Sequence, residues 1–181
     1  MINSGMQDSS PRPSRGRQRQ PIELGDLDMR IARDGTWLYR GSPINRLPLV
    51  KLFASVLRRD ADGSYWLVTP AERGRVAVED APFVAVAVDR EGGGHGQNLI
   101  FRTNLDEIVT AGPEHKLRVD EAADGTPAPY IMVRPGLDAR LLRPVFYELV
   151  EWGEEESVDG EMQFGVWSGG LFFRLGDLEA D

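Results

Sequence analysis

From about residue 23 onward, the hydrophobic positions of the chain fall into short runs separated by glycine, proline and aspartate. In several runs apolar and polar residues alternate, as in RVAVE (75–79) and HKLRVDE (115–121). Alternation with a period of two predicts β-strands with one face buried. The run PFVAVAVD (82–89) is apolar on both faces, which indicates a strand covered on both sides or one with small residues under a helix. The pattern as a whole predicts an α+β protein rich in strands.

Two segments have helical spacing instead. The first follows Asn45, which can cap it, and has Pro48 in its first turn, where the missing N–H leaves no hydrogen bond unmade. Its polar stripe is narrow, which predicts a mostly buried helix. The second helix is expected over 138–152, and Pro144 inside it predicts a kink or a short turn before the helix proper.

A glycine-rich segment, EGGGHGQ (91–97), lies between two predicted strands. Loops that hold phosphate groups lead into a helix, whose N-terminal N–H groups bind the anion. No helical pattern follows here until after Pro135, so we expect a hairpin turn with His95 exposed and mobile at its tip. The sequence SGG (168–170) predicts a second, tighter hairpin between the last two strands.

The order of elements shows an internal similarity. Strand TWLYR, a proline-marked helix and strand YWLVT recur as YIMVR, a proline-marked helix and MQFGVW. Repeated units of this kind indicate two related β-helix-β halves packed together, with a groove between them where a site can form. We expect a disordered basic tail over 1–22, an N-terminal α+β half over 23–81, and a C-terminal β-rich half with one long helix over 82–181.

Charge and composition narrow the classes of function. The net charge is −8, and because the first twenty residues carry +3, the remainder carries −11. An acidic body repels a phosphate backbone, so nucleic-acid binding by the folded part is disfavoured. The chain has no cysteine and only two histidines, far apart, which excludes disulfides and thiolate sites and predicts neither a metal site nor a cofactor. No apolar segment is long enough to span a bilayer, so we expect a cytoplasmic protein without a membrane partner.

A candidate ligand site comes from arginine, carboxylate, amide and aromatic residues near strand ends and the first helix. Arginine in such a place needs a carboxylate, from the protein or from a ligand. With no recognisable nucleophile, these residues favour a non-catalytic binding module for an unknown small molecule or protein segment over an enzyme. The residues that we predict to bind the ligand are Arg46, Asp80, Asn104, Tyr130 and Arg134.

Two other functions stay open at this point. One is a small hydrolase-like enzyme, which would use Glu79, Asp80 and His115 and needs the histidine within hydrogen-bond reach of a carboxylate. The other is a nucleic-acid binder, which would use the groove between the halves and needs a continuous positive stripe. A flat exposed edge, such as the last hairpin, could also pair with a second copy, so a homodimer is a further possibility.

Several long strings, in order, resemble a bacterial family known as domain of unknown function 1285. They are DGTWLYRGSPINRLPLVKLFASVLRRDADGSYWLVTPAE, VEDAPF, LIFRTN, PYIMVR and VFYELVE, and they cover most of residues 31–151. The resemblance implies two β-rich repeated halves, the second loosely similar to a pleckstrin-homology-type barrel. It also implies a ligand, protein or nucleic-acid site between the halves and a role in signalling. The polar positions of this resemblance are Arg46, Thr69, Glu72, Glu79, Asp80, Thr103, Asn104, His115, Tyr130 and Arg134.

Overall fold

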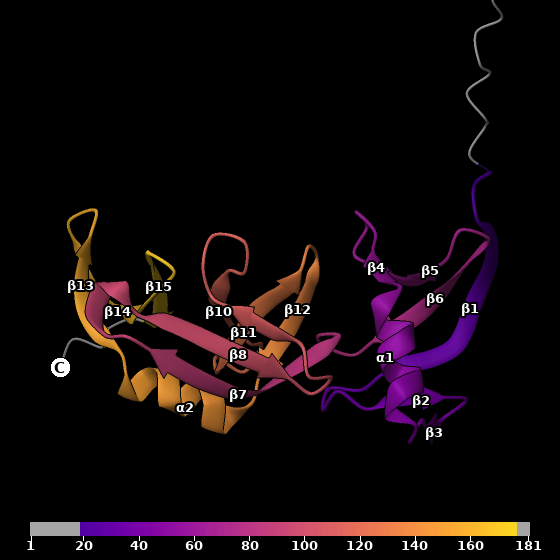
Figure 1. Cartoon of the computed structure of the whole chain (residues 1–181), viewed down its shortest axis with the longest axis horizontal. Helices are drawn as coiled ribbons and strands as arrows, with labels where there is room; N and C mark the ends of the chain where they lie inside the picture. The colour runs from indigo at the N-terminus through magenta and orange to yellow at the C-terminus, as the bar shows by residue number, and fades with distance from the viewer. Residues whose placement is uncertain (1–18, 177–181) are drawn as a thin grey trace, which may run out of the picture.

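The computed structural model describes residues 19–176, and it consists mostly of strands in three sheets (Figure 1). The prediction of a strand-rich chain is therefore confirmed, and the chain is mostly β. The disordered tail predicted for 1–22 lies outside the described residues up to residue 18, and the first strand begins at Ile22. No helix within residues 19–176 has the length and hydropathy needed to cross a membrane.

The first half of the chain forms a six-stranded sheet with the order β3-β2-β1-β6-β5-β4. Helix α1 (Leu47–Ser55) connects β3 to β4. The strands are β1 (Ile22–Ile31), β2 (Trp37–Tyr39), β3 (Ser42–Pro43), β4 (Leu57–Arg59), β5 (Tyr65–Val68) and β6 (Glu72–Val78).

The second half forms another six-stranded sheet, with the order β10-β11-β12-β7-β8-β9. Helix α2 (Arg143–Glu151) follows it and leads into a three-stranded sheet of β13 (Glu154–Val158), β14 (Glu161–Ser168) and β15 (Leu171–Gly176). The strands of the six-stranded sheet are β7 (Phe83–Glu91), β8 (Asn98–Thr103), β9 (Ile108–Thr110), β10 (Leu117–Glu121), β11 (Pro127–Arg134) and β12 (Leu137–Leu141).

The two large sheets share one topology. In each, the first and last strands of the half form a central parallel pair, β1 with β6 and β7 with β12. Each strand of that pair also belongs to an antiparallel three-stranded meander, so two meanders make up each sheet. The structure therefore agrees with two similar halves, but the predicted β-helix-β unit is wrong. Helix α1 joins the two meanders of the first sheet, whereas a short loop takes that place in the second and α2 follows the whole sheet.

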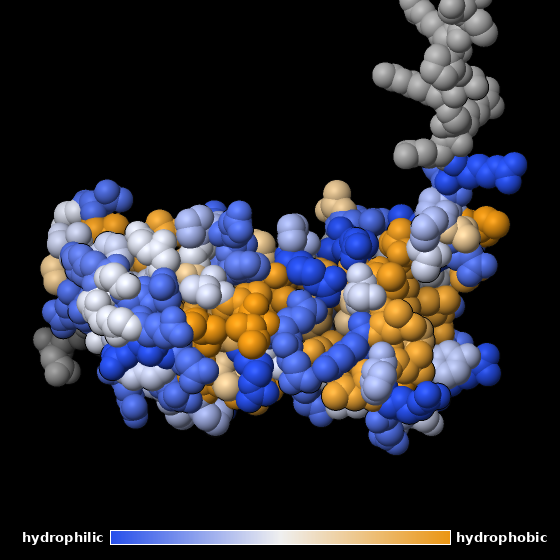
Figure 2. Space-filling model, viewed as in Figure 1, coloured by the Kyte–Doolittle hydropathy of each residue, from blue (hydrophilic) through white to orange (hydrophobic). Residues whose placement is uncertain are grey.

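Both helices differ from their predicted extent or setting. Residue Arg46, not Asn45, occupies the N-cap of α1, and no side chain caps it. The helix is also less buried than predicted, since Leu52 is 61% exposed and apolar atoms gather over α1 in Figure 2. Residues 138–141 are strand, not helix, because polar and buried apolar side chains alternate there and Pro144 fits only the first turn of α2.

The hairpin predictions are confirmed. The glycine-rich segment turns the chain from β7 into antiparallel β8, and its short 3-10 turn η1 (Gly94–Gly96) contains His95. The last hairpin closes with two residues, Gly169 and Gly170, at φ values of +56° and +78°. A positive φ at both positions gives the turn whose twist matches that of the flanking strands, and glycine adopts it without strain.

One hydrophobic core connects the sheets. It includes Trp37 and Leu57 from the first half and Phe83, Ile131 and Leu149 from the second, all 0–1% exposed. Strand β7 lies in the middle of the second sheet and packs against α2, which explains why its sequence is apolar on both faces. The second sheet thus has α2 packed on one face, and its other face carries the candidate site.

Candidate functional site

A row of three long side chains crosses the outer face of the second sheet. Strand register places Tyr130 of β11 between Arg118 of β10 and Arg140 of β12. The guanidinium carbon of Arg118 lies 4.7 Å from the centre of the tyrosine ring, and that of Arg140 lies 5.2 Å away. Neighbouring strands therefore hold the ring between two cations, an arrangement that the ring quadrupole favours.

Asp80, in the segment between the two large sheets, closes one side of this row. The Tyr130 hydroxyl donates a hydrogen bond to Asp80 Oδ1 at 2.5 Å, and Arg140 Nη1 lies 3.2 Å from Asp80 Oδ2. The Asp80 side chain is only 13% exposed. Burial, and then the hydrogen bond to the Asp80 carboxylate, raise the pKa of Tyr130. Asp80 and Tyr130, two of the predicted ligand residues, are thus in direct contact.

Arg118 is paired on the other side of the row. Its Nη1 lies 2.9 Å from Asp138 Oδ2, and its Nε lies 3.1 Å from Asp120 Oδ2. Burial works against the charged guanidinium, but the hydrogen bonds and ion pairs with Asp138 and Asp120 together outweigh it and raise the pKa of Arg118. We call the six residues the Tyr130 network: Asp80, Arg118, Asp120, Tyr130, Asp138 and Arg140. Each arginine in this network already has a carboxylate partner.

Two further predicted residues contact the first half of the chain. Asn104 accepts a hydrogen bond from the Val84 N–H at 3.0 Å and donates to the Gly35 carbonyl at 3.4 Å. Arg134 donates to the Ala54 carbonyl, at the end of α1, at 2.7 Å. Both side chains therefore join the two halves through main-chain groups.

The fifth predicted residue lies apart from these contacts. Arg46 is exposed at the start of α1, and its side chain makes no hydrogen bond or ion pair within residues 19–176. The structure thus brings together Asp80 and Tyr130, and gives Asn104 and Arg134 similar roles at the contact between the halves. Whether the five act as one ligand site stays a prediction.

The residues of the enzyme alternative have separate partners. Glu79 accepts a hydrogen bond from the Arg33 N–H at 2.8 Å and forms an ion pair with Arg30 at 3.3 Å. His115 Nδ1 lies 2.9 Å from the Met132 carbonyl oxygen, and a carbonyl can only accept, so Nδ1 carries the proton. Within the described part of the chain, no hydrogen bond joins His115 to Glu79 or to Asp80.

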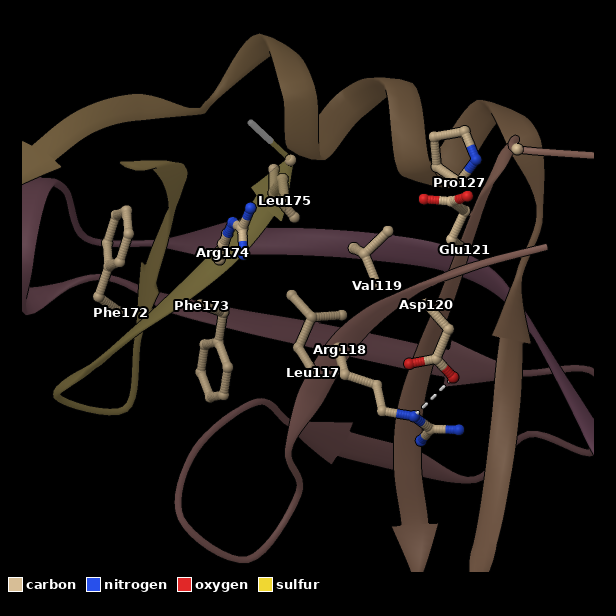
Figure 3. A pocket seen from close by; sticks show the side chains of 12 residues that line it. Leu117, Arg118, Val119, Asp120, Glu121, Pro127, Phe172, Phe173, Arg174 and Leu175 are labelled. Atoms are coloured by element: carbon tan, nitrogen blue, oxygen red, sulfur yellow. Dashed lines mark hydrogen bonds and ion pairs between the residues drawn. The ribbon is translucent and has the colours of Figure 1, made fainter. Parts of the chain in front are cut away.

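A groove that the sequence did not reveal lies beside the Tyr130 network. It runs between β10, the edge strand of the second sheet, and β15, the edge strand of the third, and has a volume of about 580 Å3. Figure 3 shows Leu117 and Val119 of β10 directed toward β15, with Phe173 of β15 facing Leu117. Leu117, Phe173 and Leu175 are 3–8% exposed, so the floor of the groove is apolar. Arg118 and Asp120 lie in its rim and belong to the network as well.

Two prolines decide which way the main chain of β10 faces. Pro129 pairs with Val119 and Pro127 with Glu121 in the antiparallel register of β10 and β11. Because proline has no N–H, these pairs cannot exchange hydrogen bonds, so they are the non-hydrogen-bonded pairs of the ladder. The N–H and C=O groups of Val119 and Glu121 therefore point away from β11 and into the groove. The same alternation directs those of Leu117 outward.

Sequence reasoning missed Arg118, Arg140 and the groove. Arg118 was visible only as a polar position of an alternating strand, and Arg140 lay in the segment expected to be helical. The groove depends on β10 and β15, two strands about fifty residues apart in sequence that contact each other without pairing. The proline alternation PAPY (127–130) was the signal that marks the free edge.

Comparisons with known proteins agree along nearly the whole chain. Residues 17–81 match the family model "Domain of unknown function (DUF1285), N-terminal domain", and residues 82–175 match "Protein of unknown function (DUF1285), C-terminal domain". The chain is 46% identical to a DUF1285 family protein from Silicibacter pomeroyi DSS-3, with a TM-score of 0.82, over 94% of this chain and 91% of that one.

A second solved structure is a DUF1285 family protein from Shewanella baltica OS155. It is 29% identical with a TM-score of 0.54, over 70% of this chain and 91% of that one. No curated protein matches the chain. Since the two family models together cover residues 17–175, the resemblance noted from the sequence is confirmed, and the chain belongs to the DUF1285 family.

Proposed function

We propose that this protein is a non-catalytic binding module that holds an extended segment of a partner protein in the groove between β10 and β15. The observation that carries the proposal is the outward-facing main chain of β10 beside an apolar floor. An extended peptide adds to a free sheet edge through main-chain hydrogen bonds, and pockets for alternate side chains give specificity. Leu117, Val119 and Glu121 supply the main-chain groups, and Phe173 and Leu175 supply apolar contacts.

The segment can pair with one edge at a time. An inserted strand needs about 4.8 Å on each side, or roughly 9.6 Å between the strands that it joins. The Cα atoms of β10 and β15 approach to within 8 Å. An inserted strand therefore does not fit where β10 and β15 are closest. We assign the pairing to β10 beyond that approach, through the outward main-chain groups that the two prolines fix.

Charge favours a basic partner segment. Residues 82–181 hold 19 acidic and 8 basic side chains, so this half carries the whole −11 of the body. The groove lining itself holds two basic residues, Arg118 and Arg174, and two acidic ones, Asp120 and Glu121. The Arg118 charge is already paired with Asp138 and Asp120, so the preference for a basic segment comes from the excess of acidic residues in this half as a whole. Complementary charge raises the association rate and excludes acidic competitors. We therefore propose an extended segment in which apolar and basic residues alternate.

Other parts of the sequence interpretation belong to this proposal. We also propose a regulatory or signalling role in the cytoplasm, which fits a module that binds without catalysis. The loose similarity of the second half to a pleckstrin-homology-type barrel is a separate part of this proposal. A small molecule at the contact between the halves is the alternative occupant. It would be held by Arg46, Asp80, Asn104, Tyr130 and Arg134.

A peptide pair tests the proposal directly. A fluorescein-labelled peptide of four Lys-Val repeats presents alternate apolar and basic side chains, and a block peptide of four lysines followed by four valines has the same composition. We expect fluorescence anisotropy to show saturable binding of the alternating peptide alone. Val119→Pro removes the outward N–H and is expected to weaken binding roughly three- to tenfold, the effect of one net hydrogen bond.

The control is Val119→Ala, which keeps the N–H and shortens the side chain. It should retain the main-chain part of the affinity, and circular dichroism and thermal melting should show that both variants are folded. Equal affinity for the two peptides would mean that net charge alone causes the binding, and it would contradict the proposed pairing of an extended segment with β10. Unchanged affinity in Val119→Pro would exclude β10 as the docking edge.

A further inference from the structure

The glycine-rich hairpin that the sequence singled out has no part in the groove, but it brings a histidine to two carboxylates. His95 of η1 stacks on Trp167 of β14 and lies beside β13, where Glu154 and Glu156 are two residues apart. One ligand atom from each of the three side chains lies within 4.8 Å of the other two. We infer that His95, Glu154 and Glu156 bind a divalent transition-metal ion, for which Zn2+ is the probe. This inference is independent of the proposed function.

The strand selects the two carboxylates. Side chains alternate along β13, so Glu154 and Glu156 share one face and Glu155 lies on the other. The antiparallel register aligns Glu154 with Gly165 and Glu156 with Gln163 of β14. The spacing of the two glutamates on one face is therefore a consequence of strand geometry, and Glu155 provides a control that carries the same charge.

The histidine is held in place by a neighbour. The His95 ring stacks on Trp167 with ring centres 4.2 Å apart and an interplanar angle of 26°. His95 Nε2 lies 3.2 Å from Glu156 Oε2, and the Trp167 indole N–H donates to that same oxygen at 3.3 Å. His95 was expected to be mobile, and although its side chain is 66% exposed, these contacts fix the ring. A side chain whose orientation is already fixed by neighbouring residues loses less conformational entropy when it binds a metal ion.

The chemistry of the three ligands matches a borderline cation. One imidazole nitrogen and two carboxylate oxygens are a donor set that Zn2+ accepts, at about 2.0–2.2 Å from each. Ligand atoms around a tetrahedral ion at those distances lie about 3.4 Å apart. The exposed Glu154, which has no ion pair within residues 19–176, closes the remaining distance by side-chain rotation. Ca2+ and Mg2+ prefer more oxygen ligands and no imidazole, so they fit poorly.

The charge around the site also favours a cation. Glu154, Glu155 and Glu156 follow one another in the half of the chain that carries −11. With His95 neutral, the three ligands bring a net charge of −2, which one divalent ion balances. The bound ion would tie the β7–β8 hairpin of the second sheet to β13 of the third, and a water molecule would complete its coordination.

Isothermal titration of the 181-residue chain, without a tag, with ZnCl2 tests the site. We expect one saturable site per chain, retained in excess Mg2+. His95→Gln and Glu156→Gln should each weaken Zn2+ binding on the order of tenfold or more. Glu155→Gln, with the same charge change on the opposite face, and His115→Gln, at the other histidine, should bind Zn2+ as the unsubstituted chain does.

Tryptophan fluorescence provides a second measurement. Co2+ at the site lies beside Trp167, one of four tryptophans, so it should quench part of the emission in the unsubstituted chain and in Glu155→Gln but not in His95→Gln. Absence of a one-to-one site would overturn the inference. So would equal Zn2+ binding and equal Co2+ quenching by His95→Gln and the unsubstituted chain. Because His95 is exposed, His95→Gln is expected to melt at nearly the same temperature as the parent, so a loss of binding in it is not a loss of folding.

Discussion

At the scale of single residues, Tyr130 shows how the candidate site is held together. Its ring lies between two guanidinium groups, and its hydroxyl proton is bonded to the Asp80 carboxylate. A tyrosinate at this position would lose its hydrogen bond to Asp80 and face a negative charge at close range. The folded structure therefore favours the protonated phenol, in agreement with the raised pKa of Tyr130.

This preference predicts a loss of stability in alkali. Since the pKa of Tyr130 is higher in the folded than in the unfolded chain, its contribution is complete below pH ~10 and is lost as pH rises from there through the folded pKa. Chemical denaturation between pH 9 and 11 (roughly the range around an ordinary tyrosine pKa) measures the free energy of unfolding. This free energy should fall less steeply with pH in Tyr130→Phe than in the parent. Tyr147→Phe, at a residue 56% exposed, should decline as the parent does; equal slopes for all three proteins would contradict the assignment.

At the scale of elements, strand β10 has two different edges. The N–H groups of Arg118 and Asp120 face β11 and take part in the ladder, whereas that of Val119 faces the groove. Proline is tolerated in a strand only where its missing N–H has no ladder partner. The two sides of one short strand should therefore respond in opposite ways to the same substitution.

We expect Asp120→Pro to lower the free energy of unfolding by about 1–3 kcal/mol, because a buried Ala128 carbonyl loses its donor. Val119→Pro should change it by less than about 1 kcal/mol, since no ladder bond is lost. Urea denaturation of both variants measures the difference. A reversed order would mean that the ladder has the other hydrogen-bond phase, and the proposed docking edge would then be wrong as well.

At the scale of the whole molecule, the two halves meet at main-chain positions that leave little room. Gly35 of the first half has φ +87°, and a Cβ there would lie 2.9 Å from Val84 Cγ2 and 2.7 Å from Asn104 Nδ2. Gly41 has a similar φ of +80° but nothing within 4 Å of the same built atom. The two glycines have similar backbone strain, but only Gly35 is approached by side chains of the second half.

Paired alanine substitutions therefore isolate the contact between the halves. Gly41→Ala should cost about 1 kcal/mol, the strain of a left-handed alanine. Gly35→Ala has the same strain and also displaces Asn104 or Val84, so it should cost about 1–3 kcal/mol more. Thermal or urea unfolding of both variants gives the comparison, and equal losses would mean that the halves separate there without penalty.

Local signals explain what the sequence predicted well. The strands around residues 75–89, the glycine hairpin and the final two-residue turn follow from alternation and from glycine at positive φ, both of which act over a few residues. The helix predicted for 138–152 is confirmed over Arg143–Glu151, but residues 138–141 were assigned to it wrongly. The segment LDARLLRPVFYELV fits a strand at one end and a helix at the other, and only the pairing with β7 and β11 decides.

The candidate site was harder to predict than the strands. Asp80 and Tyr130 were recognised by residue type, but their partner Arg140 depends on cross-strand register, which a pattern along one chain does not contain. The predicted repeat was based on the order of strands and helices along the chain. The repeat in the structure is the shared order of strands within the two six-stranded sheets. Contacts between distant strands are set by packing of the whole molecule and have no local signature.

The central parallel pair of each large sheet has a consequence for folding kinetics. Ile31 pairs with Val78, 47 residues later, and Phe83 pairs with Ala139, 56 residues later. Each meander can form from neighbouring residues, but the pair that unites two meanders must first close a long loop, and such contacts slow folding. Each half should therefore fold in milliseconds to seconds, with its outermost sequence segments joining last, at the centre of the sheet.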